Sequence, residues 1–241
     1  MDELVTNAAP LIVALDVSDA ATAFALADKL RGVVGAYKIG SRLFTAEGPA
    51  FVRHMVEQGD RVFLDLKYHD IPTTVAGAVS AAARLGVWML TIHASGGVAM
   101  MKAAQYAADA AKVFARPRPI IVGITVLTSL DESGLMEIGV QGPVENQVVR
   151  LARQAEASGL DGVVSSPLEI AAIRRTVGSS FLIVTPGIRD LPPEGGSHDD
   201  QSRTMTARQA LAAGASYIVV GRPIISATDP RAAAERLLGG A

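Results

Sequence analysis

The stretch RVFLDLKYHDIP, residues 61–72, runs from an apolar segment into a dense cluster of charge and then into a proline. Alternate residues of a strand share a face, so Asp65 and Lys67 are predicted to point one way and the leucines beside Asp65 the other. Pro72 suits the first turn of a helix. The stretch therefore predicts a strand that ends in charged side chains and leads into a helix.

The same unit, a short apolar strand followed by an alanine-rich helix, recurs along the chain. Strands are predicted over residues 11–17, 35–40, 61–67, 87–93, 119–127, 161–164, 180–185 and 216–220. Helices are predicted over residues 20–30, 41–58, 72–85, 98–114, 143–157, 167–176, 204–213 and 230–238. Four glycines between a helix and the next strand are predicted to end the helices in the left-handed conformation: Gly59, Gly86, Gly159 and Gly214.

Eight such units predict an α/β fold, a closed (β/α)₈ TIM barrel in one domain of residues 1–241, with residues 1–9 as a flexible N-terminal segment. Strands that are apolar on both faces agree with a parallel sheet covered by helices. The competing fold is an open doubly wound sheet, which the number of units and the missing Gly-x-Gly-x-x-Gly disfavour. Two connections, residues 128–142 and 186–203, are too long for turns and are predicted to be lids.

Composition excludes several classes of protein. The chain has no cysteine, which excludes disulfides, thiolate nucleophiles and cysteine-ligated metals. A net charge of −2, with charges dispersed and only 5% aromatic residues, argues against a nucleic-acid binder. The acidic N-terminus lacks the pattern of a signal peptide, and no apolar run approaches the roughly 20 residues that span a membrane. We therefore expect a cytoplasmic protein that binds no nucleic acid or membrane.

Polar residues that follow the strands of a barrel converge at one mouth. In this chain they are Asp16, Lys38, Asp65, Lys67, His93, Thr128, Ser165, Ser166, Arg189 and Arg222. Loops after strands seven and eight commonly hold a phosphate, and here Gly221 allows an anion close to the backbone while Arg222 offers a planar fork of donors. The pattern predicts a phosphorylated small-molecule ligand; the alternative is a glycine turn with a solvated arginine.

The charged cluster of the third strand predicts the type of reaction. Asp65 and Asp70 bracket Lys67, and such carboxylates favour an ammonium over the free amine that a Schiff base requires. A substrate carboxylate beside Asp65 would meet like charge, and its loss as CO2 would leave a carbanion beside Lys67. The ammonium could stabilise that charge and then deliver a proton. The alternative is an ordinary salt bridge at a strand end.

Residues 65–72, DLKYHDIP, resemble the Asp-x-Lys-x-x-Asp-Ile-Pro signature of the orotidine 5′-phosphate decarboxylase family in its bacterial form. Further segments match that family in order along nearly the whole chain. They are ALD (14–16), YKIG (37–40), TIHASGG (91–97), VLTS (126–129), TPGIR (185–189), DDQSR (199–203) and VGRPI (220–224).

The resemblance implies that the protein decarboxylates orotidine monophosphate to UMP, the last step of de novo UMP synthesis, without cofactor or metal. It implies catalytic roles for Lys67 as proton donor and for Lys38, Asp65 and Asp70 in one network with it. The implied substrate-binding residues are Asp16, Lys38, Asp65, Ile71, Thr74, Thr128, Ser129, Pro186, Arg189, Gln201, Gly221 and Arg222.

Within that set, the resemblance assigns the ribose hydroxyls to Asp16 and Lys38, and the pyrimidine edge to Thr128 or Ser129. The phosphate would contact Arg189, Gln201, Gly221 and Arg222. It also implies a homodimer in which Asp70 and Thr74 complete the site of the partner subunit.

Two alternatives remain open. A magnesium-dependent sugar-phosphate decarboxylase or aldolase of the same group of barrels shares Asp-x-Lys-x-x-Asp, but lacks the Ile-Pro that follows here and the Asp-Asp-Gln of the second long loop. A non-catalytic phosphosugar-binding barrel would be expected to have lost Lys67 or Asp65, and both are present.

Overall fold

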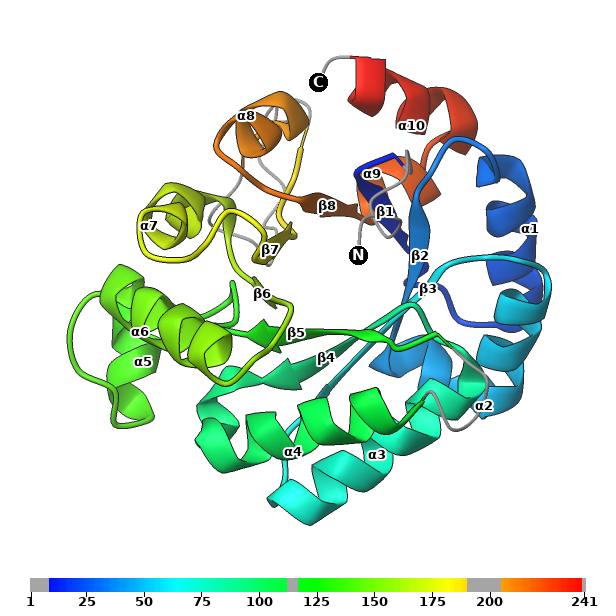
Figure 1. Cartoon of the computed structure of the whole chain (residues 1–241). Helices are drawn as coiled ribbons and strands as arrows, with labels where there is room; N and C mark the ends of the chain where they lie inside the picture. The colour runs from blue at the N-terminus through cyan, green and yellow to red at the C-terminus, as the bar shows by residue number, and fades with distance from the viewer. Residues whose placement is uncertain (1–8, 112–116, 190–204, 240–241) are drawn as a thin grey trace.

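Eight parallel strands close into a barrel in the computed structural model, which describes residues 9–111, 117–189 and 205–239 (Figure 1). The strands are β1 (Leu11–Ala14), β2 (Ala36–Gly40), β3 (Val62–Tyr68), β4 (Met89–His93), β5 (Ile120–Ile124), β6 (Gly162–Val164), β7 (Leu182–Thr185) and β8 (Tyr217–Val220). Each pairs with its neighbours in sequence, and β8 pairs with β1 to close the ring. The predicted (β/α)₈ barrel is confirmed.

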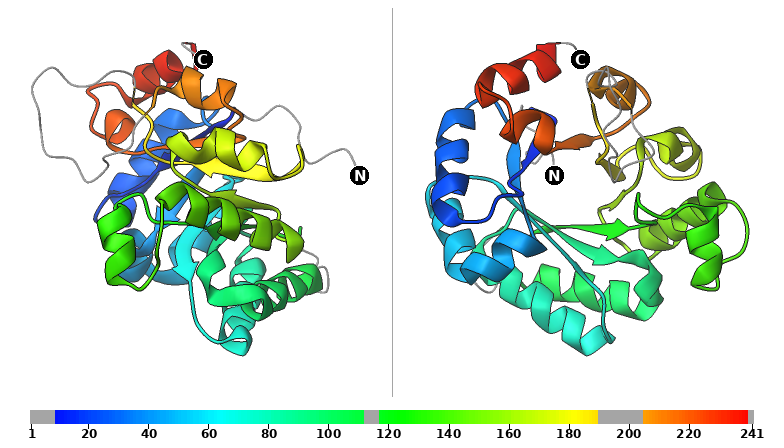
Figure 2. Two further views of the ribbon diagram at one scale, coloured as in Figure 1. Left: turned by 90° about the vertical axis from the view of Figure 1, so that its left-hand side faces the viewer. Right: turned by 180° about the vertical axis from the view of Figure 1, so that it is seen from behind.

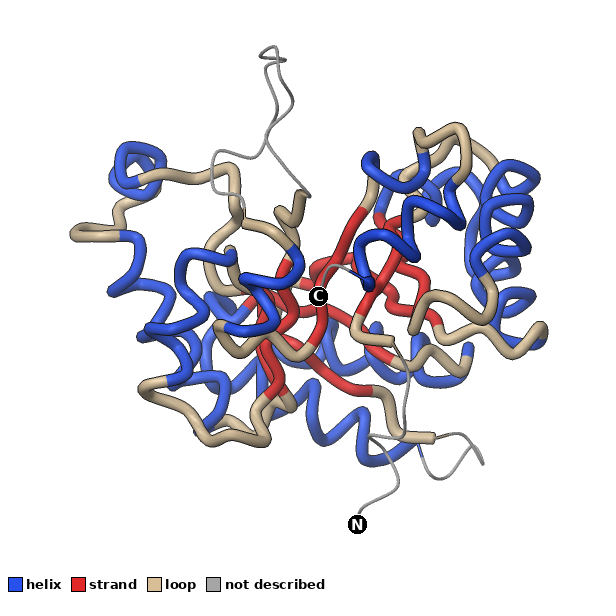
Figure 3. The backbone as a smooth tube through the Cα atoms, turned by 90° about the horizontal axis from the view of Figure 1, so that it is seen from above, coloured by secondary structure: helices blue, strands red, loops and turns tan. Residues whose placement is uncertain are grey.

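Helices surround the ring of strands, as the two further views in Figure 2 and the view from above in Figure 3 show. They are α1 (Ala20–Leu30), α2 (Ser41–Glu57), α3 (Pro72–Leu85), α4 (Gly97–Asp109), α5 (Glu132–Glu137), α6 (Val144–Ala157), α7 (Ile170–Arg174), α8 (Ala207–Ala212), α9 (Arg222–Ile225) and α10 (Pro230–Gly239). Two short 3-10 helices, η1 (Ala94–Gly96) and η3 (Pro167–Glu169), precede α4 and α7. No helix in the described ranges is both long and apolar enough to cross a membrane, and the cytoplasmic location stays a prediction.

Apolar side chains form two cores because successive strand residues point to opposite faces. Leu11 and Val13 of β1 belong to the larger core, between strands and helices. Ile12 and Ala14 belong to a smaller core inside the barrel. Its other buried members are Ala36, Phe63, Met89, Val122, Val184 and Val219. The inner core fills the barrel, so a ligand can enter only at an end.

The four predicted glycine helix ends are confirmed, with φ between 82° and 109°. The predicted continuous helix over residues 41–58 is kinked instead. Gly48 has φ 70° and ψ −172° inside α2, and Pro49 follows it. Proline has no N–H for the helical ladder and clashes with the preceding turn, so the helix restarts there.

Two predicted strands end earlier than expected. β1 stops at Ala14 and β5 at Ile124, while Asp16, Val126 and Leu127 line a cavity at the mouth instead. The predicted lid over residues 128–142 contains helix α5, whose N-cap Asp131 accepts a hydrogen bond from the Gly134 N–H at 2.8 Å. Most of the second predicted lid lies outside the described residues, as do residues 1–8, so the flexible N-terminal segment and the one-domain extent stay predictions.

Candidate active site

A cavity of about 270 Å³ opens at the carboxyl ends of the strands. Nine predicted site residues line it: Asp16, Lys38, Asp65, Lys67, Thr128, Pro186, Arg189, Gly221 and Arg222. Its apolar wall includes Phe63, Ile124 and Val164 from β3, β5 and β6. A cavity with a few convergent polar groups on an apolar wall is the usual form of a small-molecule site.

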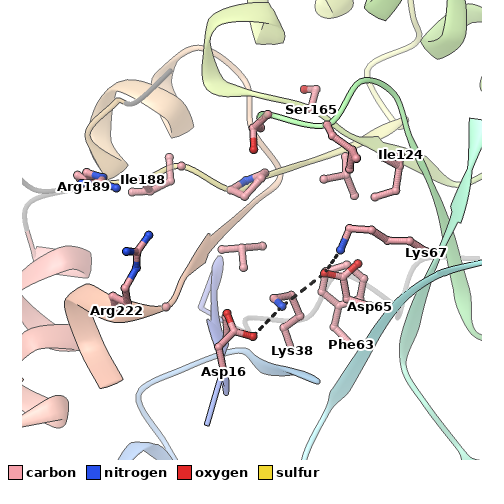
Figure 4. A pocket seen from close by; sticks show the side chains of 18 of the residues that line it. Asp16, Lys38, Phe63, Asp65, Lys67, Ile124, Ser165, Ile188, Arg189 and Arg222 are labelled. Atoms are coloured by element: carbon pink, nitrogen blue, oxygen red, sulfur yellow. Dashed lines mark hydrogen bonds and ion pairs between the residues drawn. The ribbon is translucent and has the colours of Figure 1, made fainter. Parts of the chain in front are cut away.

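Carboxylates and ammonium groups alternate along one wall of this cavity (Figure 4). The Lys38 Nζ lies 3.4 Å from an oxygen of Asp16 and 3.4 Å from Asp65 Oδ2. The same Asp65 oxygen accepts a hydrogen bond from the Lys67 Nζ at 2.8 Å. One carboxylate oxygen is therefore shared by two ammonium groups, one of which also pairs with Asp16.

Asp65 is 7% exposed, yet its surroundings favour the charged form. Burial alone raises the pKa of this carboxyl group, because a carboxylate loses its hydration inside the protein. The charges of Lys38 and Lys67, with hydrogen bonds from Lys67 and Thr91, outweigh burial and hold the Asp65 pKa below its usual value. Asp65 is therefore ionised at neutral pH and keeps both ammonium groups at the site.

The opposite end of the cavity is built from the segments that follow β7 and β8. Arg189 follows an isolated bridge between Ile188 and Met205, and its N–H donates to the Met205 carbonyl at 3.0 Å. Arg222 is the first residue of α9, directly after Gly221. Figure 4 shows both arginines on the side away from Lys67 and Asp65. Two guanidinium groups at one end provide the donors that a phosphate requires.

Other predicted residues do not line the cavity. Asp70, Ile71 and Thr74 lie exposed where β3 leads into α3, and the Asp70 carboxylate accepts a hydrogen bond from the Ile71 N–H at 2.6 Å. Within the described part of the chain, Lys67 has an ion pair with Asp65 and none with Asp70. The expectation that Asp65 and Asp70 of one chain bracket Lys67 is therefore wrong, because the chain turns away from the strand before Asp70.

The remaining predicted residues divide into those that line the cavity and those that do not. Thr128 lines the cavity, whereas Ser129 is exposed and outside it. Of the wider set of strand-end residues, Ser165 lines the cavity, and His93 and Ser166 do not. His93 instead stacks on His69 with ring centroids 5.0 Å apart. Gln201 lies outside the described residues.

Sequence reasoning missed two features of the site. Lys67 has φ 53°, a left-handed conformation that pattern reasoning does not predict for a lysine in a strand. Thr91, a fully buried residue of β4, donates a hydrogen bond to Asp65 at 3.0 Å. Thr91 begins the segment TIHASGG, but a threonine in an apolar strand gives no signal of its own.

Comparison with known proteins identifies relatives over nearly the whole chain. The sequence model described as "Orotidine 5'-phosphate decarboxylase / HUMPS family" matches residues 9–237. The orotidine 5'-phosphate decarboxylase of Moorella thermoacetica is 53% identical over 229 residues, covering 94% of this chain and 90% of the relative. That of Dichelobacter nodosus is 48% identical over 232 residues, covering 96% of this chain and 98% of the relative.

Solved structures agree with the sequence comparison. A crystal structure of orotidine 5'-phosphate decarboxylase from Lactobacillus acidophilus has a TM-score of 0.84 at 38% identity, covering 95% of this chain and 97% of that chain. An uncharacterized conserved protein from Geobacillus kaustophilus has a TM-score of 0.81 at 40% identity, covering 95% and 99%. The chain therefore belongs to the orotidine 5′-phosphate decarboxylase / HUMPS family.

Proposed function

We propose that this protein converts orotidine 5′-phosphate to UMP and CO2, and that Lys67 protonates the carbanion left by the departing CO2. The observation that carries the proposal is the buried carboxylate of Asp65 with two ammonium groups at one end of the cavity and two arginines at the other. Family membership over residues 9–237 supports this reaction for the site. The product makes the protein an enzyme of pyrimidine biosynthesis.

The substrate would bind with its charged ends at the two ends of the cavity. Arg189 and Arg222 would hold the phosphate, with the backbone of Gly221 and the side chain of Gln201 beside it. Asp16 and Lys38, which lie 3.4 Å apart, would hold the ribose hydroxyls. Binding energy from the remote phosphate would thus position the ring at the reacting end.

The pyrimidine would lie between the phosphate end and the lysines. Thr128 would contact its polar edge, since Ser129 is outside the cavity. Phe63, Ile124 and Val164 would contact the ring itself, and an apolar wall strengthens the electrostatic interactions inside the site. The carboxylate of the substrate would then face the end that contains Asp65 and Lys67.

The bond to the carboxyl carbon breaks with its electron pair left on the ring carbon, and the carboxyl group departs as CO2. The new carbanion lies beside the Lys67 ammonium, which stabilises it electrostatically. Lys67 then transfers one proton from Nζ to the ring carbon, which yields UMP, and regains a proton from solvent. Asp65 orients the Lys67 side chain, since its Oδ2 lies 2.8 Å from Nζ.

We further propose a homodimer in which Asp70 and Thr74 of one subunit complete the site of the other. The support is that these residues and Ile71, which is 63% exposed, lie outside the cavity of their own chain. The test mixes Lys67→Ala with Asp70→Ala protein. Hybrid dimers contain one intact site in two, so random mixing should restore about one quarter of wild-type activity. Confirmed hybrids without activity would refute the shared site.

The reaction is tested by following the absorbance of orotidine 5′-phosphate with purified protein, with and without excess EDTA. Turnover that EDTA does not change is expected. Turnover that EDTA abolishes would indicate a metal-dependent relative of the same barrel group. Binding of UMP without any turnover would indicate a phosphosugar-binding barrel and would refute the proposal.

A further inference from the structure

A break in the pairing of β3 with β4 lies directly beside the charged cluster. Leu64 pairs with Leu90, and the next paired residues are Tyr68 and Ile92. Three residues of β3, residues 65–67, therefore lie opposite a single residue of β4, Thr91. Bulges of this kind re-aim side chains next to active sites.

The extra residues of β3 change the backbone at Lys67. Its φ of 53° is the only positive φ of a non-glycine residue in the described ranges. L-residues rarely adopt this conformation, because the side chain approaches the backbone too closely. Such a conformation persists only where the surrounding structure holds it, so some contact at Lys67 has to hold the turn.

The hydroxyl of Thr91 makes that contact. The Lys67 N–H donates to Thr91 Oγ1 at 2.8 Å, and Thr91 Oγ1 donates in turn to Asp65 Oδ1 at 3.0 Å. An amide N–H can only donate and an ionised carboxylate can only accept, so the direction of both hydrogen bonds is settled. One hydroxyl thus joins the backbone of the lysine to the side chain of its carboxylate.

The two oxygens of Asp65 consequently have separate partners. Oδ1 accepts from Thr91, and Oδ2 faces Lys67 at 2.8 Å and Lys38 at 3.4 Å. Thr91 is 0% exposed and does not line the cavity. It can therefore orient the charged groups without touching the substrate.

We propose that Thr91 is a positioning residue for the decarboxylation, whose hydroxyl fixes the Lys67 backbone and the Asp65 carboxylate in one arrangement. This inference rests on the proposed function. Without the hydroxyl, the backbone N–H of Lys67 loses this partner and Asp65 is free to rotate. The Lys67 ammonium then no longer points consistently at the ring carbon. Proton delivery therefore slows, while the affinity for the substrate stays nearly the same.

The test compares two matched pairs at position 91 in the full-length protein: wild type with Thr91→Val, and Thr91→Ser with Thr91→Ala. Each pair differs in one hydroxyl group. Loss of a buried hydrogen bond to a charged group should lower kcat by about 10- to 100-fold in Thr91→Val, and in Thr91→Ala relative to Thr91→Ser. KM for orotidine 5′-phosphate and Kd for UMP should change less than about threefold.

The pH profile of kcat provides a second measurement that packing alone would not move. Asp65 faces Lys38 from β2, Lys67 from β3 and His93 from β4. Because the Thr91 hydrogen bond favours the carboxylate, its loss should shift the acidic limb of the profile to higher pH. In Thr91→Ser, which retains the hydroxyl, the acidic limb of the kcat profile should lie at the same pH as in the wild type.

Several results would overturn the inference. One is a kcat that depends on the methyl group of Thr91 and not on its hydroxyl. In that case kcat of Thr91→Val would equal the wild-type value, and kcat of Thr91→Ser would be lower. If Thr91→Val fails to fold, the Ser and Ala variants carry the same comparison, with UMP binding as proof of an assembled site. A wild-type protein without turnover would refute the proposed function and this inference together, whereas normal turnover in the wild type and both hydroxyl-free variants would refute this inference alone.

Discussion

The two ends of the barrel both contain partly buried charges, but the pairing differs. At the amino end one cation is shared by two carboxylates, whereas at the carboxyl end one carboxylate is shared by two cations. At the amino end, Arg118 precedes β5 and meets two carboxylates, Asp109 at 2.7 Å and Asp161 at 2.9 Å. Asp161 also accepts a hydrogen bond from the Ile121 N–H at 2.7 Å, which ties it to the start of β5. The charges there satisfy one another and the backbone.

At the carboxyl end, two cations share one carboxylate instead. The buried carboxylate of Asp65 is shared by Lys38 and Lys67, and Lys38 also pairs with Asp16. Arg189 and Arg222 line the other end of the cavity. Four cationic side chains thus line one cavity, an arrangement that attracts an anionic ligand. The difference indicates that the amino end serves stability, whereas the carboxyl end is arranged for an anionic substrate.

The largest effect is expected from Lys67→Ala, which removes the proton donor and half of the cationic pair. Turnover should fall by about 10⁴-fold or more, because proton transfer and carbanion stabilisation are lost together. UMP binding should persist, since the phosphate end is intact. Lys29→Ala, on the exposed face of α1, is the matched control. Near-normal turnover in Lys67→Ala would refute the proton-donor role.

A smaller effect is expected at the phosphate end from Arg222→Ala. Losing a charged hydrogen-bond donor should lower kcat/KM for orotidine 5′-phosphate by about 10- to 100-fold. Orotidine, which lacks the phosphate, should react equally slowly with the variant and the wild type. An equal loss of kcat/KM for orotidine 5′-phosphate and for orotidine would mean that Arg222 does not contact the phosphate.

A substitution at the amino end of the barrel should lower stability and leave turnover nearly unchanged. Arg118→Met removes the cation between Asp109 and Asp161, and should lower the free energy of unfolding by about 1–3 kcal/mol. The melting temperature should fall by several degrees while kcat stays within about twofold of wild type. A large loss of kcat with an unchanged melting temperature would contradict the division between the two ends.

The smallest effect is the pH dependence of stability at Asp65. Its pKa in the folded protein is below the usual value, so its ionised form stabilises the fold above about pH 4 and this contribution is lost as the pH falls further. The difference in unfolding free energy between wild type and Asp65→Asn should therefore narrow on acidification. A difference that widens would mean that Asp65 is protonated in the folded protein near neutral pH.

The barrel could be predicted from the sequence because its signals are local and repeated. Each strand–helix unit contains its own apolar run, and glycines such as Gly86 end helices by the same left-handed turn. Seven of the nine predicted residues that line the cavity were predictable as polar residues at strand ends, which meet at one mouth of a barrel. Gly221 was predicted from the loop after the eighth strand, and Pro186 from the family resemblance. Helix α5 was missed because it has only 6 residues, within a loop that contains Gly134, Gly139 and Gly142.

The fine geometry of the site depends on contacts between strands, and the sequence does not show those. The positive φ of Lys67 comes from the mismatch of β3 with β4, which no property of lysine predicts. The place of Asp70 likewise depends on how the chain leaves β3, and spacing alone led to the wrong pairing with Lys67 of the same chain.

The central claim, that Lys67 is the proton donor, is tested most directly by hydrogen–deuterium exchange in UMP. The exchange is followed at the ring carbon that is bonded to the carboxylate in orotidine 5′-phosphate. Protonation by Lys67 is reversible in principle, so wild-type protein in D2O should replace that hydrogen by deuterium, as followed by NMR. Lys67→Ala should bind UMP without exchange, whereas Lys29→Ala should exchange like the wild type. Exchange by Lys67→Ala at the wild-type rate would contradict the account, because the carbanion would then form and be protonated without the lysine.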